Sequence, residues 1–413
     1  MVIDDHPLFP YTPPMTSSLT ILWPKLAAPD IAETRFSYDF CRRLSRQLCT
    51  GSGQASLWVE CSNDAAIGDI LPRIQGDAAL LVTQPEMVVS ASTTEILAKC
   101  LEKGYRVCGP VYNQTPFPHQ QASLPAAYVD IHTYLEVADI LARNNGHKAI
   151  AVESLDPACI LFRTRILTEI PSRTVHSQLS NFILNTGIDP IAVAPGALVH
   201  SGFTKGFETE RLDLVGLVPE GVKCILDIGC AKGGYGKALR QERPEIILTG
   251  VELNPVLAEA AVGYYDEIIN CPIEEAGIRG PFDLINCGDI LEHLQDPWGL
   301  LKTLNRLLKD DGYLALSIPN AGHWSMVKAL LRGDFQYVPL GLICIGHLRW
   351  FTETSIRDAL QQAGFAIEVF KREQIPPTPE GERFIREMCT GRYGDERSLR
   401  TNEFIIRAVK QIA

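Results

Sequence analysis

In the second half of the chain, hydrophobic runs of strand length alternate with segments whose hydrophobic residues have helical spacing. Short apolar runs of strand length occupy residues 224–227, 246–251, 282–287 and 313–318, and apolar positions at helical spacing fill segments such as 297–308. Asn254-Pro255 predicts one helix start, and Thr352 predicts another helix that stops at Gly364. Asp310-Asp311-Gly312 predicts a turn before the run at 313–318. Two last runs, 367–370 and 404–409, are separated by a charged loop. The pattern predicts an α/β fold with a mostly parallel sheet and a late antiparallel pair.

The first half of the chain shows a second α/β pattern. Strands are predicted at 19–23, 57–60, 78–83, 105–111 and 149–153, and helices at 33–48, 93–103 and 134–143. Periodicity weakens at 202–206, which we interpret as a linker between domains at 18–204 and 205–413. Residues 1–17 are rich in proline and acid and are predicted to be a disordered leader, not a signal peptide.

Composition narrows the classes of function. The chain has 413 residues and a formal net charge of −11, which disfavours nucleic acid as a partner. Its 12 cysteines form no CxxC pair, so we expect small core residues in a reducing, cytoplasmic compartment and no metal site. Apolar runs are too short to predict a transmembrane segment.

The most informative chemistry lies at the ends of the strands at 224–227 and 246–251. Asp227 leads directly into a glycine-rich turn and a helix, and Glu252 closes the next strand. Such a turn places backbone N–H groups against a nucleotide-like ligand, and the second acid can accept both ribose hydroxyls. An adenosine-type cofactor is therefore predicted. A nicotinamide dinucleotide is the competing cofactor, but Asp227 precedes the first glycine and the Gly-x-Gly-x-x-Gly register is imperfect.

Several motifs in order resemble the class I S-adenosylmethionine-dependent methyltransferases. Leu226-Asp227-Ile228-Gly229-Cys230-Ala231-Lys232-Gly233-Gly234 is similar to their first motif, and Glu292-His293-Leu294-Gln295-Asp296-Pro297 is similar to a Glu-His-Leu-x-Asp-Pro subgroup. The resemblance covers about residues 205–413 and implies a Rossmann-like, seven-stranded sheet that binds S-adenosyl-L-methionine. It implies cofactor contacts from Asp227, Gly229, Cys230, Ala231, Gly233, Glu252, Leu253, Cys287 and Asp289. Cys271-Pro272-Ile273-Glu274 departs from the family, which often has an aspartate there for adenine.

Candidate acceptor chemistry follows the fourth strand of this domain. His293 lies at the sheet edge where α/β folds bind ligands, and it is either a general base or a structural histidine. His323, His347 and Trp350 are candidate substrate-binding residues, with Trp324 and Phe351 as possible parts of an aromatic wall or of the core. Residues 341–346 depart from the subgroup. The charged segment 371–397 is predicted to be a solvated insertion.

The first half resembles, more faintly, a GT-A glycosyltransferase. Residues 80–86, 104–111, 155–165 and 194–200 carry the resemblance, but Gln84-Pro85-Glu86 stands where a metal-binding Asp-x-Asp is typical. We therefore expect a degenerate domain that positions a glycan or a glycan-biosynthesis partner. Together the resemblances predict O-methylation of a sugar hydroxyl. The alternatives are a small-molecule O- or N-methyltransferase, a bifunctional glycosyltransferase–methyltransferase, and a non-catalytic scaffold that binds the cofactor.

Overall fold

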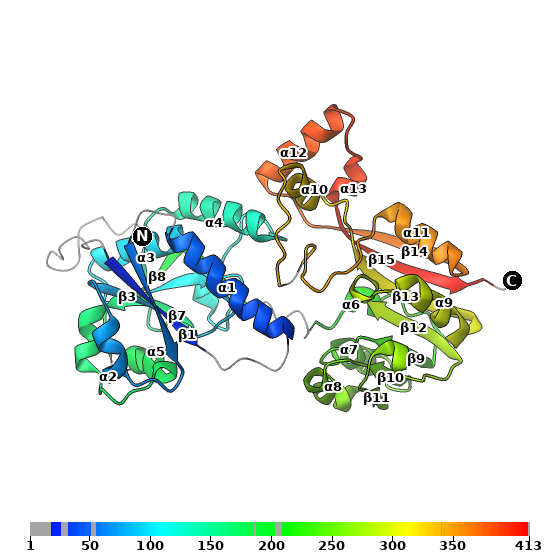
Figure 1. Cartoon of the computed structure of the whole chain (residues 1–413), viewed down its shortest axis with the longest axis horizontal. Coiled ribbons are helices and arrows are strands. Elements are labelled where there is room, and N and C mark those ends of the chain that lie inside the picture. Colours follow the sequence, from blue (N-terminus) through cyan, green and yellow to red (C-terminus); the bar gives the residue numbers. More distant parts are fainter. Residues whose placement is uncertain are drawn as a thin grey trace. The chain divides into compact units, whose positions relative to one another are not determined.

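The computed structural model describes residues 18–25, 32–50, 55–185, 187–202, 209–339 and 341–411. The chain divides into two compact units, Met1–Phe203 and Thr204–Ala413 (Figure 1). The leader predicted at 1–17 and most of the linker predicted at 202–206 lie outside the described residues. Each unit is therefore described by itself.

The N-terminal unit is built on one mixed sheet. Its strands are β1 (Ser18–Lys25), β2 (Ala55–Ser62), β3 (Ala78–Val82), β4 (Met87–Val88), β5 (Val107–Tyr112), β6 (Ile150–Ala151), β7 (Cys159–Arg163) and β8 (Ile191–Ser201). Its helices are α1 (Ala32–Thr50), α2 (Ile67–Ile70), α3 (Ala91–Glu102), α4 (Ile131–Asn145) and α5 (His176–Asn185). The strand order is β2-β1-β3-β7-β5-β8-β4, with β6 paired to β8.

Three of these strands, the two-residue β4 and the longer β7 and β8, were not among the predicted elements. β7 and β8 are almost entirely buried, but so are β3 and β5, which their apolar runs did predict. β8 differs in carrying Pro195-Gly196 in its middle, a pair that is typical of a break in a strand. β7 runs antiparallel to both β3 and β5, whereas β8 runs parallel to β5. The mixture of directions excludes a simple series of βαβ units in this half.

The C-terminal unit contains a seven-stranded sheet. Its strands are β9 (Cys224–Ile228), β10 (Ile247–Val251), β11 (Glu267–Ile269), β12 (Phe282–Gly288), β13 (Leu308–Pro319), β14 (Phe365–Gln374) and β15 (Thr401–Lys410). Its helices are α6 (Leu212–Val215), α7 (Gly234–Glu242), α8 (Pro255–Ala261), α9 (Pro297–Leu307), α10 (Trp324–Leu331), α11 (Glu353–Gln362), α12 (Pro379–Thr390) and α13 (Glu396–Arg400). A 3-10 turn, η7 (Leu291–His293), follows β12.

The strand order β11-β10-β9-β12-β13-β15-β14 confirms the predicted fold class. The first five strands are parallel, and β15 is antiparallel to both β13 and β14. Neighbouring residues of one strand face opposite sides: Ile225 packs with α6 and α7, whereas Leu226 packs with α9 and α11. The sheet is thus covered by helices on both faces, which leaves its strand ends as the place for a ligand.

Two local predictions need correction. The turn expected at 310–312 lies within β13, where the register with β12 shifts between Phe282 and Leu284 and takes up the extra residues. The segment 371–397 is not merely solvated, because it folds into α12 and part of α13. Ile385 and Leu399 from these helices bury their side chains against Trp324 of α10. Figure 1 shows α10, α12 and α13 grouped together.

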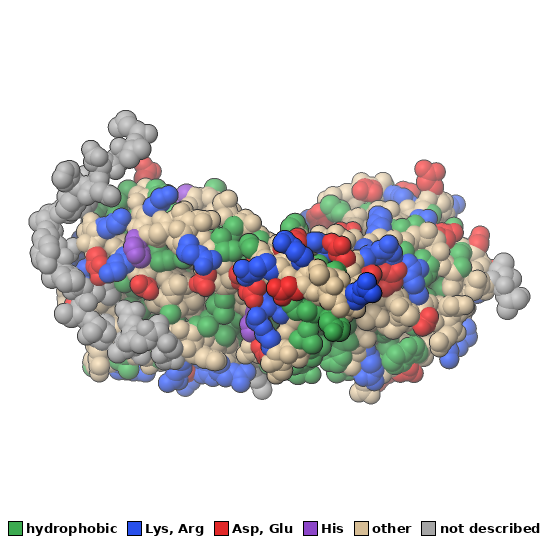
Figure 2. Space-filling model, turned by 90° about the horizontal axis from the view of Figure 1, so that it is seen from above, with side chains coloured by type: hydrophobic (Ala, Val, Ile, Leu, Met, Phe, Trp, Pro, Cys, Tyr) green, Lys and Arg blue, Asp and Glu red, His purple; other side chains and the backbone are tan. Residues whose placement is uncertain are grey.

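The surface carries both signs of charge. Figure 2 shows basic and acidic side chains interspersed over one face. Within the described ranges, no helix has both the length and the apolar character needed to cross a membrane.

Candidate functional site

The glycine-rich turn after β9 is tightly constrained. Gly229 has a φ of 73°, and a Cβ on it would lie 2.1 Å from Cδ1 of Ile290. Its N–H and that of Cys230 donate to the carbonyl oxygen of Val251 at 2.8 and 3.2 Å. Gly233, also at positive φ, immediately precedes α7. The turn therefore joins the ends of β9 and β10 and presents the start of a helix.

Glu252 holds this turn from the end of β10. Its Oε2 accepts a hydrogen bond from the N–H of Ala231 at 2.9 Å, and Oε1 accepts one from the N–H of Asn254 at 2.8 Å. The next side chain, Leu253, is 67% exposed. A carboxylate with acceptor capacity left on both oxygens, beside an exposed apolar side chain, fits a ribose and the base attached to it.

Asp227 is buried beneath the turn. Its carboxylate accepts hydrogen bonds from the hydroxyl of Tyr265 and from the Nδ2 amide of Asn286, the latter at 2.7 Å. Burial raises the pKa of Asp227 to about 6, although these two donors favour the ionised form. Neither donor was predicted from the sequence, since Tyr265 and Asn286 belong to no glycine-rich motif. Asp227 therefore organises the site from within, and its predicted contact with the cofactor stays a prediction.

The side chains of Cys230 and Cys287 point into the core, so only their backbone atoms are available to a ligand. Asp289, after β12, is more open. It accepts from the hydroxyl of Ser317 at 2.7 Å and pairs with Arg211 at 2.5 Å. Burial would raise the pKa of Asp289, but Arg211 and Ser317 together hold it below its ordinary value.

Arg211 is a site residue that the sequence reading missed. Its guanidinium also pairs with Asp213 at 2.7 Å and with Glu403 of β15 at 3.2 Å. Burial, with the nearby Asp289, raises the pKa of Glu403 to about 8. Arg211, Ala231 and Asp289 are three of the four non-glycine residues at positive φ in the described part of the chain. Backbone strain of this kind is concentrated at functional sites.

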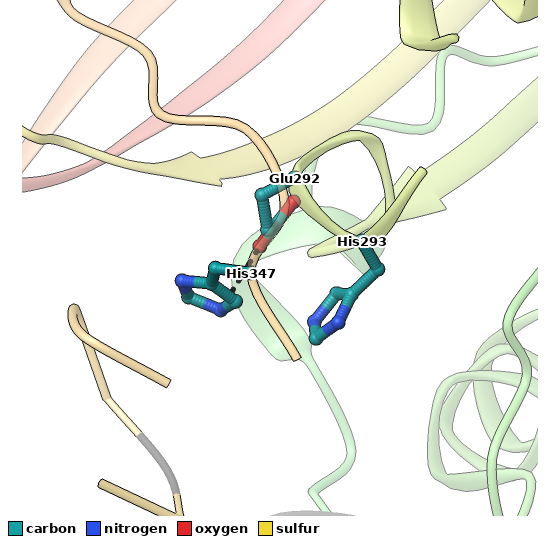
Figure 3. A group of neighbouring side chains, drawn as sticks. All are labelled: Glu292, His293 and His347. Carbon is teal, nitrogen blue, oxygen red and sulfur yellow. Dashed lines mark ion pairs between the residues drawn. The ribbon is translucent and has the colours of Figure 1, made fainter. Parts of the chain in front are cut away.

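A second group of side chains lies beside the 3-10 turn η7. Glu292 and His293 come from this turn, and His347 comes from the loop that precedes Trp350 (Figure 3). The rings of His293 and His347 meet edge to face with centroids 4.9 Å apart, and Nε2 of His347 lies 4.0 Å from Oε1 of Glu292. Each residue offers one possible metal-ligand atom, and these atoms lie within 4.8 Å of one another. The sequence shows no metal-ligand spacing, so this group was not predicted.

Backbone hydrogen bonds hold the two segments together. The carbonyl oxygen of Glu292 accepts from the N–H groups of Leu348 and Arg349 at 2.7 and 3.0 Å. Gly346 packs on His293, because a Cβ there would lie 2.8 Å from the Nδ1 atom of the ring. The loop and η7 thus behave as one piece, with His293 on its exposed side.

The remaining predicted acceptor residues divide into buried and exposed. His323 is buried and caps α10 through Ser325, and Trp324 and Phe351 are core residues. Trp350 is 38% exposed and its ring contacts that of Phe335, which in turn contacts Tyr337. Trp350 is therefore open to solvent and its acceptor contact stays a prediction, whereas the buried ring of His323 is taken up in capping α10.

Comparisons with known proteins agree on the C-terminal unit. A family model described as a methyltransferase domain matches residues 205–368. Ubiquinone biosynthesis O-methyltransferases of Pseudomonas paraeruginosa and Coxiella burnetii are 28% identical over 144 residues and 27% identical over 122 residues. These matches cover 32% and 28% of this chain, and 58% and 51% of the relatives, so the chain spans little more than half the length of either.

A solved structure of similar fold is the S-adenosylmethionine-dependent methyltransferase of Archaeoglobus fulgidus. It is 20% identical, and the match covers 50% of this chain and 98% of that one, with a TM-score of 0.36. The family match begins at residue 205, and the glycosyltransferase resemblance of the first half finds no support in these comparisons.

Proposed function

We infer the function of this chain from one premise: its C-terminal unit belongs to the family of S-adenosylmethionine-dependent methyltransferases. We propose that this unit transfers the cofactor's methyl group to a hydroxyl oxygen of an acceptor. The observation that carries the proposal is Glu252, whose carboxylate sits between the glycine-rich turn and the exposed Leu253.

The cofactor would lie along the ends of β9, β10 and β12. Glu252 would accept hydrogen bonds from the two ribose hydroxyls, and Leu253 would pack on the adenine. At the other end, Asp289 would accept the methionine ammonium, and Arg211 carries the positive charge that suits the methionine carboxylate. The glycine turn would cover the methionine chain between them.

Methyl transfer from a sulfonium is an in-line displacement, so the chain mainly has to align the acceptor. The acceptor oxygen attacks the methyl carbon, and the electron pair of the broken carbon–sulfur bond stays on sulfur. The hydroxyl proton must leave at the same time. His293 lies at the strand-end edge on the exposed side of η7, which is where a general base for that proton would be needed.

Calorimetric titration of the full chain with S-adenosylmethionine and S-adenosylhomocysteine tests the cofactor. We expect micromolar affinity in the wild type and at least about 100-fold weaker binding in Glu252→Ala, since two hydrogen bonds to a carboxylate are lost. Glu245→Ala, an exposed acid before β10, is the matched control. Circular dichroism separates lost binding from lost fold. Binding by Glu252→Ala equal to that of the wild type would contradict the proposal.

The acceptor is proposed separately. Exposed Trp350, with Phe335 and Tyr337 beside it, offers a face on which a sugar ring would stack, and we propose a sugar hydroxyl as the first acceptor to test. The curated relatives are named for ubiquinone biosynthesis, so a phenolic hydroxyl is the second candidate. Incorporation of labelled methyl into nucleotide sugars and glycans, against simple phenols, decides between them. Labelling of phenols alone would exclude the sugar acceptor.

A further inference from the structure

The carboxylate of Glu292 is buried without a hydrogen-bond partner among the described residues. Its side chain is 2% exposed, and neither oxygen has a hydrogen bond in the described part of the chain. Removing a carboxyl group from water without a compensating interaction costs several kcal/mol, so such groups are rare in folded proteins. Of the charged groups nearby, Asp289 and Glu403 disfavour the ionised form of Glu292, and Arg211, which favours that form, is paired with both of these acids.

The neighbouring His347 makes the buried carboxylate of Glu292 less favourable still. Its Nδ1 lies 3.1 Å from the carbonyl oxygen of Leu342, which can only accept, so we assign the ring proton to Nδ1. The lone pair of Nε2 then faces the carboxylate 4.0 Å away. Two electron-pair donors facing each other in a buried site require a cation or a proton between them.

His293 completes the set from the exposed side. Figure 3 shows the three side chains directed into one space, with the imidazole of His293 opposite that of His347. A carbonyl that fixes one imidazole so that its other nitrogen is unprotonated is the usual second contact of a metal-binding histidine.

We propose that Glu292, His293 and His347 bind one divalent transition-metal cation of the zinc type. Two imidazoles and one carboxylate suit Zn²⁺ or Co²⁺, whereas Mg²⁺ and Ca²⁺ prefer oxygen ligands. Ligand atoms around a tetrahedral zinc ion lie about 3.4 Å apart, given bonds of about 2.1 Å. The 4.0 Å between Glu292 and His347 has to shorten by little more than half an ångström.

The role of such a cation rests on the proposed function, although its binding does not. Three protein ligands leave one position open, and the exposed side of His293 places that position toward solvent. An acceptor hydroxyl bound there would have a lowered pKa and would release its proton to water as its oxygen takes the methyl group. In that state His293 is a ligand, and the acceptor oxygen no longer needs it as a base.

The test uses the full chain, stripped with a chelator and titrated with Zn²⁺ and Co²⁺ in the absence of S-adenosylmethionine. We expect one equivalent of either ion to bind, a visible spectrum of four-coordinate Co²⁺, and a rise in Tm on Zn²⁺ binding. Glu292→Gln and His347→Ala should each weaken binding at least tenfold. His119→Ala, an exposed histidine of the N-terminal unit, should bind as the wild type does.

Three results would overturn the proposal. They are no binding by the stripped wild type, binding unchanged in both variants, and a Co²⁺ spectrum dominated by thiolate charge transfer, which would assign the ion to cysteines. Calorimetry with S-adenosylmethionine on the same samples keeps the two proposals apart. Cofactor binding without metal binding would leave the methyltransferase proposal standing alone, and metal binding without cofactor binding would do the reverse.

Discussion

Two regions lie at the same strand ends: the cofactor edge, which comprises the glycine-rich turn with Asp227 and Glu252, and the group around Glu292. They differ in how many hydrogen bonds their carboxylates accept. Asp227 and Glu252 each accept two hydrogen bonds from the chain itself. Glu292 is equally buried and accepts none from the described residues. In the first region the protein itself supplies the hydrogen-bond donors. In the second region the proposed cation supplies the missing partner. A pocket's unsatisfied atoms are therefore as informative about function as its formed bonds.

The largest effect is expected from His293→Ala. Loss of a general base, or of a metal ligand at the acceptor, should lower methyl transfer at least about 100-fold. The affinity for S-adenosylmethionine should stay within about twofold, because the ring lies outside the cofactor edge. Transfer of labelled methyl and calorimetry on the same samples measure the two quantities. Full activity in this variant would remove His293 from the reaction and leave it a structural residue of η7.

The variant Tyr265→Phe tests the hydrogen-bond network around Asp227. The hydroxyl donates to Asp227 and accepts from the N–H of Gly236 at 3.1 Å, so its removal leaves two buried groups short of a partner. The free energy of unfolding should fall by about 2 kcal/mol. Urea denaturation measures it, with the half-buried neighbour changed in Tyr264→Phe as the control. Equal stability of the two variants would mean that the Asp227 network contributes little.

A smaller effect is expected from Gly346→Ala. The added methyl group would lie 2.8 Å from Nδ1 of His293 and should turn the ring away from His347. We expect a loss of about tenfold in methyl transfer without a change in cofactor affinity, in line with the cost of misplacing a catalytic group. Gly263→Ala, where a Cβ meets open space, is the matched control. A loss of cofactor affinity instead would show that the two regions are not independent.

The smallest effect is a pH dependence of stability in metal-free protein. Burial and the nearby Asp289 raise the pKa of Glu292 well above 4.5, so the folded chain holds this proton more tightly than the unfolded chain. The stability that this proton contributes is full below pH 4.5 and is lost as the pH rises through the folded pKa.

Glu292→Gln does not titrate, so its free energy of unfolding should rise relative to that of the wild type as the pH increases from 4.5. Urea denaturation in a chelating buffer across this range measures the difference. A constant difference between the two proteins would show that Glu292 does not change its protonation state there.

Sequence patterns predicted the features that depend on residues close together in the chain. The glycine turn, Glu252 and the capped start of α11 at Thr352 all follow from residues adjacent in sequence, and the structure forms them. Arg211, Tyr265 and Asn286 were missed because their partners lie far along the chain, where no spacing rule applies. β8 was missed for a different reason, since Pro195-Gly196 in its middle is typical of a turn and not of a strand interior.

The group around Glu292 shows the same limit more sharply. Glu292-His293 was noticed as a motif, but His347 joins it only through the backbone bonds from Leu348 and Arg349 to the Glu292 carbonyl. Spacing rules for metal ligands detect pairs on one helix or one loop, and this set is divided between two segments.

Those two backbone bonds have an evolutionary consequence. They anchor the loop of His347 through N–H groups, which every residue except proline supplies, so the side chain at 348 is free to change without releasing the loop. The side chain of Arg349 adds a further tie, because its guanidinium donates to the carbonyl oxygen of Gln295. Leu348 and Trp350 both reach solvent at this place. Substitution at these two exposed positions would therefore change the surface that an acceptor meets, while the backbone bonds keep Glu292, His293 and His347 in place.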